Sequence, residues 1–147
     1  MPGPQVPDTS VLIPLLRDRK RRSEFLSYMT SHQVRLSAVV VAELLAGSRS
    51  NEDTELIQTT AMHFREAQRL LTPTFEDWLR AGEQLQRYSE RYGRAEPRAH
   101  IADALIVASV ARVKGTVVTH NVVHMTNWAS LIMGARVLDA ATIIPPS

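Results

Sequence analysis

The chain has 147 residues, a length that fits one domain with a core large enough to fold without disulfides or a structural metal. An apolar share of 44% and a charged share of 22% are ordinary for a globular protein, and the net charge is +2. The absence of cysteine excludes a disulfide framework and a thiolate metal site. No apolar run reaches the roughly 18 residues of a membrane helix, and residues 1–8 lack the pattern of a signal peptide. We therefore expect a cytoplasmic protein.

Nearly all of the positive charge is carried by arginine, since Lys20 and Lys114 are the lysines of the chain. Arginine pairs bidentately with phosphate. Most of these arginines are interpreted as solvated helix faces. The cluster over residues 17–22 is denser and is a candidate contact for a polyanion.

Short strands alternate with helices along the chain. We predict a short strand at 5–8, helices at 9–17 and 20–31, a strand at 34–37, and a helix at 39–46 that ends at Gly47. Next come a helix at 52–70, a strand at 70–73, a helix at 76–92, a loop at 91–98 and an apolar helix at 99–113. The last elements are a strand at 116–119, a helix at 125–133 and a strand at 136–138. This alternation favours parallel β-α units in a single domain spanning 1–147.

Apolar spacing predicts which helical side chains face inward. The predicted inward residues are Phe25, Leu26, Met29, Leu56, Ile57, Met62, Phe64, Trp78, Leu79, Gly82, Leu85 and Tyr88.

Three carboxylates lie at positions that make them candidates for a functional site. Asp103 interrupts an otherwise apolar helix, and Glu43 does the same in the helix at 39–46. A buried, unpaired carboxylate is costly, so each needs a partner, a proton or a metal. Asp8 follows the first predicted strand, and parallel sheets gather functional groups at the carboxyl ends of their strands.

Each acid also has a separate structural interpretation. Asp8 can cap the following helix, Glu43 can pair with an arginine, and Asp103 can pair with an arginine or bond His100. Two carboxylates ~4 Å apart repel by ~4 kcal/mol at an effective dielectric near 20. A divalent cation reverses that sign, and oxygen ligands favour Mg²⁺ or Mn²⁺ over zinc.

The segments 8–12, 41–47 and 101–108, which carry these acids, resemble the first three motifs of PIN-domain nucleases. Their order and spacing are most similar to VapC-type toxins of bacterial toxin–antitoxin pairs. The resemblance implies a three-layer α/β/α sandwich with a short, mostly parallel sheet. It also implies an Mg²⁺- or Mn²⁺-dependent endoribonuclease that hydrolyses RNA with metal-activated water, with Asp8, Glu43 and Asp103 as metal ligands. The partners it implies are an RNA substrate, a second copy in a homodimer, and a small VapB-like antitoxin.

The fourth family motif, Thr-x-Asn/Asp-x-x-Asp-Phe, is altered here to Thr119-His120-Asn121-Val122-Val123-His124-Met125. His124 replaces the last acid, and Asn121 keeps a carbonyl oxygen suited to a metal-bound water. Three roles stay open for His124: a manganese ligand, a group that orients water, or a cation that meets the scissile phosphate. Since one acid is missing, we expect weaker magnesium binding and a preference for manganese.

Near the first acid, Pro7 removes a backbone donor, so we expect a truncated first strand and a loosened Asp8. Thr9 or Ser10 is expected to orient a ligand. Arg94, Arg98 and Arg112 are further candidate RNA contacts.

Three other functions stay open at this point. A PIN-fold protein that has lost activity would bind RNA or a partner without cleaving it. A phosphatase would use Asp8 as its nucleophile, although such enzymes carry a second acid where Ser10 stands. A zinc site through His120 and His124 would require that stretch to be helical.

Overall fold

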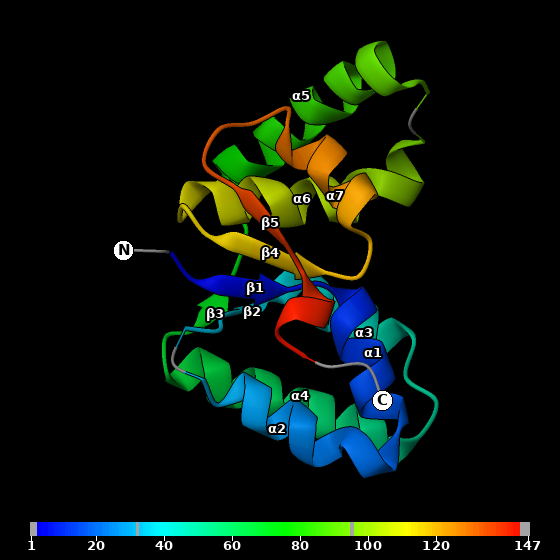
Figure 1. The fold of residues 1–147 in the computed structure, drawn as a ribbon, viewed down its shortest axis with the longest axis vertical. Helices are drawn as coiled ribbons and strands as arrows, with labels where there is room; N and C mark the ends of the chain where they lie inside the picture. The colour runs from blue at the N-terminus through cyan, green and yellow to red at the C-terminus, as the bar shows by residue number, and fades with distance from the viewer. Residues whose placement is uncertain (1–2, 32, 95, 145–147) are drawn as a thin grey trace.

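Short parallel strands form the centre of the computed structural model, which describes residues 3–31, 33–94 and 96–144. The strands are β1 (Gln5–Pro7), β2 (Leu36–Ser37), β3 (Leu70–Leu71), β4 (Thr116–Thr119) and β5 (Arg136–Asp139). They pair in parallel in the orders β1-β4-β5 and β2-β3. A bridge between Gln5 and Val34 joins the two parts, so β1 lies between β2 and β4 (Figure 1).

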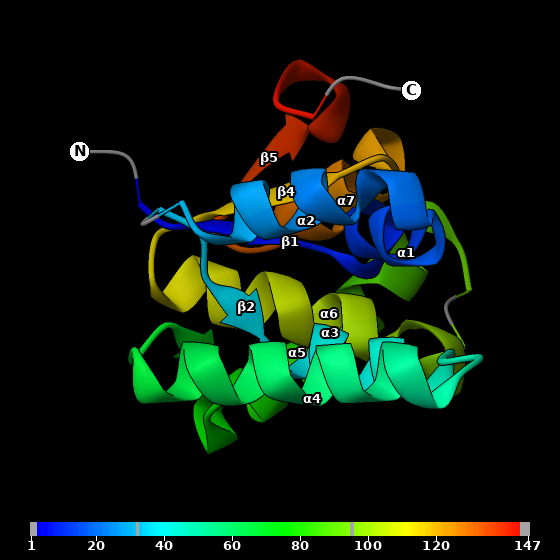
Figure 2. The same cartoon turned by 90° about the horizontal axis from the view of Figure 1, so that it is seen from below.

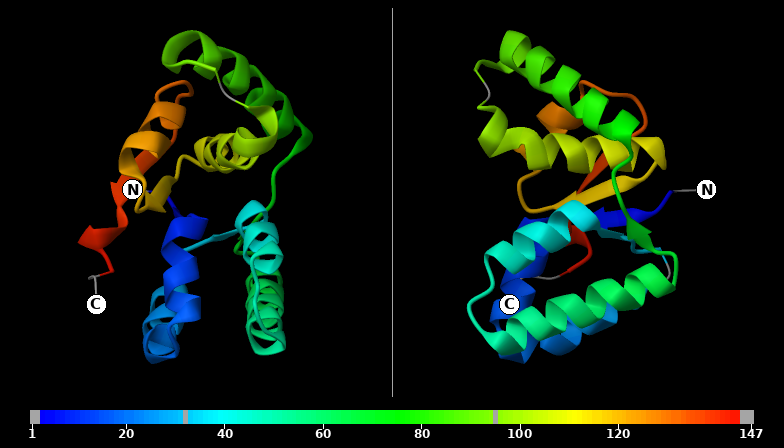
Figure 3. Two further views of the ribbon diagram at one scale, coloured as in Figure 1. Left: turned by 90° about the vertical axis from the view of Figure 1, so that its right-hand side faces the viewer. Right: turned by 180° about the vertical axis from the view of Figure 1, so that it is seen from behind.

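Helices cover both faces of these strands. They are α1 (Thr9–Arg17), α2 (Arg22–Met29), α3 (Ala38–Ala46), α4 (Asn51–Glu66), α5 (Phe75–Tyr92), α6 (Pro97–Arg112) and α7 (Val122–Ala129), with 3₁₀ turns at Arg19–Arg21 and Ala140–Thr142. Figures 2 and 3 show α1, α2 and α7 on one side and α3 to α6 on the other. The predicted three-layer α/β/α architecture is confirmed. Among the described residues, every helix is too short or too polar to cross a membrane.

The first strand is not loosened by its proline. Val6 pairs with Val117 and Pro7 with Val118, and the Asp8 N–H donates to the Val118 carbonyl at 2.9 Å. Gln5 instead exchanges hydrogen bonds with the residues 33 and 35 on the β2 side. Because bonding directions alternate along a strand, the missing N–H of Pro7 faces the β2 side. The expectation of a loosened Asp8 is therefore wrong, since β4 holds its backbone.

Several helix ends differ from the predicted ones. Helix α6 begins at Pro97 rather than residue 99, because proline suits the first turn of a helix. Helix α4 ends at Glu66 rather than residue 70, and Gln68 then adopts a left-handed φ of 58° before β3. Helix α7 starts at Val122 and ends at Ala129, earlier than predicted at both ends.

Four side chains predicted to face inward are exposed. In α5 the buried positions are Asp77, Ala81 and Gln84, spaced as one helical stripe. Asp77 lies at the start of this stripe, where its carboxylate accepts from Arg112 at 2.9 Å. Leu85 and Tyr88 of the predicted row are partly buried against the core. The exposed residues are Leu26 at 49%, Met62 at 45%, Trp78 at 52% and Leu79 at 53%.

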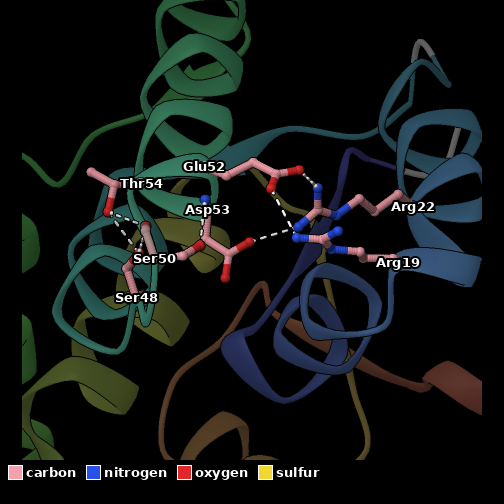
Figure 4. A network of polar contacts seen from close by, with 7 residues as sticks. All are labelled: Arg19, Arg22, Ser48, Ser50, Glu52, Asp53 and Thr54. Carbon is pink, nitrogen blue, oxygen red and sulfur yellow. Dashed lines mark hydrogen bonds and ion pairs between the residues drawn. The ribbon is translucent and has the colours of Figure 1, made fainter.

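The arginine cluster joins α2 to α4 within the chain (Figure 4). Arg22 bonds Glu52 at 2.5 Å and Asp53 at 2.7 Å, and Arg19 reaches Glu52 at 3.1 Å. These arginines hold the pKa of the Glu52 carboxyl below its usual range. Much of the cluster's charge is therefore balanced internally, and it is a weaker polyanion contact than its sequence indicates.

Candidate active site

Three acids from distant parts of the sequence lie at the carboxyl end of the sheet. Asp8 directly follows β1 and is buried, with 6% of its surface exposed. Glu43 lies in α3, which starts directly after β2 because Ser37 caps it by accepting from the N–H groups of Val39 and Val40. Asp103 lies in the first half of α6, and the residues from Ala104 to Ala111 that follow it are buried. These buried residues anchor the helix, while the partly buried residues 100–103 face the site.

Hydroxyl groups orient two of these acids. The Ser10 hydroxyl donates to Asp8 Oδ1 at 2.5 Å, and the Thr9 hydroxyl donates to Glu43 Oε1 at 2.7 Å. Both candidates for orienting a ligand therefore contact an acid. In the part of the chain that the structure describes, neither Asp8 nor Glu43 forms an ion pair with an arginine. The interpretation of Glu43 as an arginine partner is wrong.

The pKa values show that the three acids act on one another. Burial raises the pKa of Asp8, and the Ser10 and Thr119 hydroxyls counteract it only in part while Asp103 raises it further. Burial also raises the pKa of Glu43, with further contributions from the charges of Asp103 and Asp8. The site therefore holds mutually repelling negative charge whenever all three carboxyls are ionised.

Asp103 has a partner that its sequence neighbours do not suggest. Its Oδ2 lies 2.8 Å from His124 Nε2, and the two side chains are 28% and 35% exposed. Trp128 Nε1 lies 3.3 Å from the same imidazole nitrogen. An indole N–H only donates and a carboxylate only accepts, so Nε2 cannot bond well to both. The shorter contact assigns its hydrogen to the bond with Asp103.

The fourth motif forms the turn between β4 and α7. The Asn121 N–H donates to the Thr119 hydroxyl at 2.9 Å, and the His120 N–H donates to the Ser10 hydroxyl at 3.0 Å. These bonds tie the turn to the segment that carries Asp8. Asn121 and His120 are both exposed. Of the predicted site residues, Asp8, Glu43, Asp103 and His124 therefore gather, with Asn121 at the solvent side of the turn.

His100 also lies at this site, although the sequence indicated it only as a possible hydrogen-bond partner of Asp103. It lies one helical turn before Asp103 on α6, and its ring is 5.7 Å from that of His124. Tyr88 stacks on it with ring centres 6.3 Å apart, and Trp128 lies 6.1 Å away. The i, i+3 spacing of His100 and Asp103 was the available signal. His124, not His100, makes the hydrogen bond to Asp103.

Arg112 has a structural partner instead of a free position on the surface. Its Nε donates to Asp77 Oδ2 at 2.9 Å, and Asp77 is completely buried. A second nitrogen of Arg112 donates to the Thr72 carbonyl at 3.2 Å. Because these two bonds hold the guanidinium against the fold, Arg112 is a weaker candidate for an RNA contact than its sequence indicates.

Comparison with known proteins identifies the fold. Residues 6–123 match the family model of the PIN domain. FitAcB from Neisseria gonorrhoeae is 20% identical, with 92% of this chain and 97% of that chain covered at a TM-score of 0.64. DNA-bound VapBC from Salmonella typhimurium is 16% identical, with 94% and 98% covered at 0.64. VapBC-5 from Mycobacterium tuberculosis, a member of the VapBC family of toxin–antitoxin systems, is 19% identical, with 94% and 99% covered at 0.57. No curated protein is detectably similar in sequence.

Proposed function

The chain belongs to the PIN domain family, and on that premise we propose that it is a metal-dependent endoribonuclease that acts as the toxin of a toxin–antitoxin pair. The observation that carries the proposal is the gathering of Asp8, Glu43 and Asp103 at one end of the sheet, where burial, and to a lesser degree the charges of the neighbouring acids, raise the pKa of Asp8 and Glu43. Repulsion between these charges costs stability unless a cation offsets it.

The three acids fit Mg²⁺ or Mn²⁺ as a loosely held ion. Their donors are all oxygens, as these hard cations prefer. Among the described residues, the acids do not converge as closely as the group of His100, Asp103 and His124, whose ligand atoms lie within 4.8 Å of one another. Mg²⁺ keeps several waters and needs only one or two direct carboxylate ligands. A wide acidic site therefore suits it.

The side chains of the chain have separate tasks in this proposal. A bound Mg²⁺ would supply Lewis-acid chemistry, lowering the pKa of water and offsetting charge on the phosphate. The Ser10 hydroxyl holds Asp8 and the Thr9 hydroxyl holds Glu43, so the ligand oxygens are oriented before an ion arrives. In this proposal Asn121, in the exposed turn, would orient the attacking water toward the phosphate.

His124 occupies the position of the acid that ends the fourth motif, and its imidazole carries a proton where that acid would carry a negative charge. Its Nε2–H donates to Asp103 Oδ2, so the imidazole replaces the negative charge of the usual acid with a neutral or positive ring. This lowers the total negative charge of the site. The smaller negative charge supports our expectation that magnesium binds weakly and that manganese is preferred.

The proposed antitoxin would cover this acidic end of the molecule. Solved structures with this fold include complexes of the VapBC family of toxin–antitoxin systems. A cationic side chain of a partner, facing Asp8, Glu43 and Asp103, would offset their repulsion in place of a metal.

We further propose that two copies associate through exposed apolar side chains of α5. Phe75, Trp78 and Leu79 are 69%, 52% and 53% exposed. Trp78 lines an open pocket of about 440 Å³ together with Val39 of α3 and Ile101 of α6, and Glu43 also lines it. Such a patch marks an interface. In sedimentation velocity, Trp78→Glu should give monomers while the control Met133→Glu, at a position 95% exposed, stays dimeric.

The central experiment is RNA cleavage by the untagged protein with Mg²⁺, with Mn²⁺ and with EDTA. We expect cleavage with either metal, none with EDTA, and none by Asp8→Asn. Asp18→Asn is the matched control, because Asp18 is exposed and caps a turn that asparagine also caps. RNA binding without metal-dependent cleavage would instead establish the inactive binding module. Growth arrest on expression, lost in Asp8→Asn, tests the toxin role.

A further inference from the structure

We propose that His100, Asp103 and His124 form a site for a transition-metal dication such as Zn²⁺ or Co²⁺, which shares Asp103 and His124 with the proposed nuclease site and adds His100. The three side chains each offer one ligand atom, and these atoms lie within 4.8 Å of one another. In the part of the chain that the structure describes, this is the one group of three acidic or histidine side chains that converges in this way.

The fold brings the three ligands together from two helices. His100 and Asp103 stand three residues apart on α6, which places them on one helical face. His124 lies in α7, which packs against α6. Both helices are held by buried residues, Ala104 to Ala111 in α6 and Met125 and Trp128 in α7. The ligands therefore stand on rigid elements, as a metal site requires.

The donor set selects the class of metal. Two imidazole nitrogens and one carboxylate oxygen are the ligands of zinc and similar ions, whereas Mg²⁺ takes oxygen ligands and gains little from imidazole. Two ligands of a tetrahedral zinc ion lie about 3.3 Å apart, from bond lengths near 2.0–2.1 Å. Asp103 Oδ2 and His124 Nε2 are 2.8 Å apart, so an ion between them would move these two atoms apart by about 0.5 Å. The ligand atoms of all three side chains lie within 4.8 Å of one another, so the His100 ring would move closer to the pair.

Without such an ion, one buried nitrogen of the group has no partner in the described part of the chain. His100 Nδ1 is buried and has no hydrogen-bond partner among the described residues. A buried polar nitrogen in that state is unfavourable and needs an explanation. His124 Nε2 faces both a carboxylate and the donating N–H of Trp128. Asp103 Oδ2 and His124 Nε2 share a hydrogen, and both atoms are of the kinds that bind metals. A dication bound between them would replace that hydrogen.

Aromatic rings surround the group and restrict its access to water. Tyr88 stacks on Trp128 with ring centres 4.1 Å apart and contacts the rings of both histidines. An apolar surround of this kind fixes ring orientation and strengthens ion binding. The Tyr88 and Trp128 rings also place an intrinsic fluorophore beside the site.

The test is direct binding of Co²⁺ or Zn²⁺ to the untagged protein in the presence of excess Mg²⁺. We expect one Co²⁺ per chain, seen by visible absorption typical of low coordination number, and competed by Zn²⁺. His100→Ala and His124→Ala should each weaken binding by at least about tenfold. His120→Ala, an exposed histidine outside the group, should bind as the parent does.

Thermal unfolding in EDTA shows whether each variant is folded, and His100→Gln provides a second variant that preserves side-chain size. Equal Co²⁺ affinity in the parent, His100→Ala and His100→Gln would overturn the proposal, as would displacement of Co²⁺ by millimolar Mg²⁺. The site shares Asp103 and His124 with the nuclease proposal, whereas Asp8 belongs to the nuclease proposal alone. Asp8→Asn should lose cleavage but keep Co²⁺ binding, so failure of one proposal is distinguishable from failure of the other.

Discussion

Removal of the Arg112 guanidinium tests whether that side chain serves the fold or an RNA ligand. In Arg112→Ala, the buried Asp77 carboxylate loses a 2.9 Å bond and the Thr72 carbonyl loses a 3.2 Å bond. Removing one partner of a buried ion pair costs ~3–5 kcal/mol. Since the Arg112 side chain is 34% exposed while Asp77 is fully buried, solvent screening places the expected loss at the lower end, about 3 kcal/mol.

For a domain of this size, 1 kcal/mol corresponds to about 3 °C, so the melting temperature should fall by about 9 °C. Circular dichroism melts of the parent, Arg112→Ala, Asp77→Asn and the double variant measure this loss. Asparagine at position 77 keeps the capping bond from the Thr74 N–H but removes the charge, so the double variant should be more stable than Arg112→Ala. A melting temperature within 2 °C of the parent, combined with weaker RNA binding by Arg112→Ala, would refute the structural assignment.

The site yields three further predictions. In EDTA at pH 7.5, Asp8→Asn should unfold at a higher temperature than the parent, because the pKa of Asp8 is raised and its ionised form therefore opposes folding. This difference in melting temperature should vanish below pH 3.8, the ordinary pKa of an aspartate. A difference that persists at pH 3 would contradict the electrostatic cause. His124→Asp should lower the Mg²⁺ concentration for half-maximal cleavage by roughly tenfold, as measured by metal titration, while His120→Asp leaves it unchanged. Arg22→Ala should lower the melting temperature by about 3 °C and Arg19→Ala by less than about 1 °C. The reason is that the Arg22 side chain is 22% exposed, whereas the Arg19 side chain is 78% exposed. Equal effects would show that burial does not decide the strength of these ion pairs.

The sequence by itself determined the architecture and the main acids. Alternating strands and helices predicted the three layers, and the acid inside the apolar helix at 99–113 pointed to Asp103. These features are local, because periodicity and the cost of a buried charge are visible in a short segment. The motif resemblance then joined Asp8 and Glu43 to Asp103, and the fold places all three at the carboxyl ends of the strands.

The tertiary structure decided how the side chains pair. Asp103 bonds His124 across two helices, and the buried Asp77 of α5 bonds Arg112 of α6. Neither contact has a signal in sequence spacing, since the partners are 21 and 35 residues apart. Pro7 by itself predicts a weakened first strand, but in the sheet the missing N–H of Pro7 faces away from β4. Contacts between distant segments depend on how the layers pack, which no local pattern encodes.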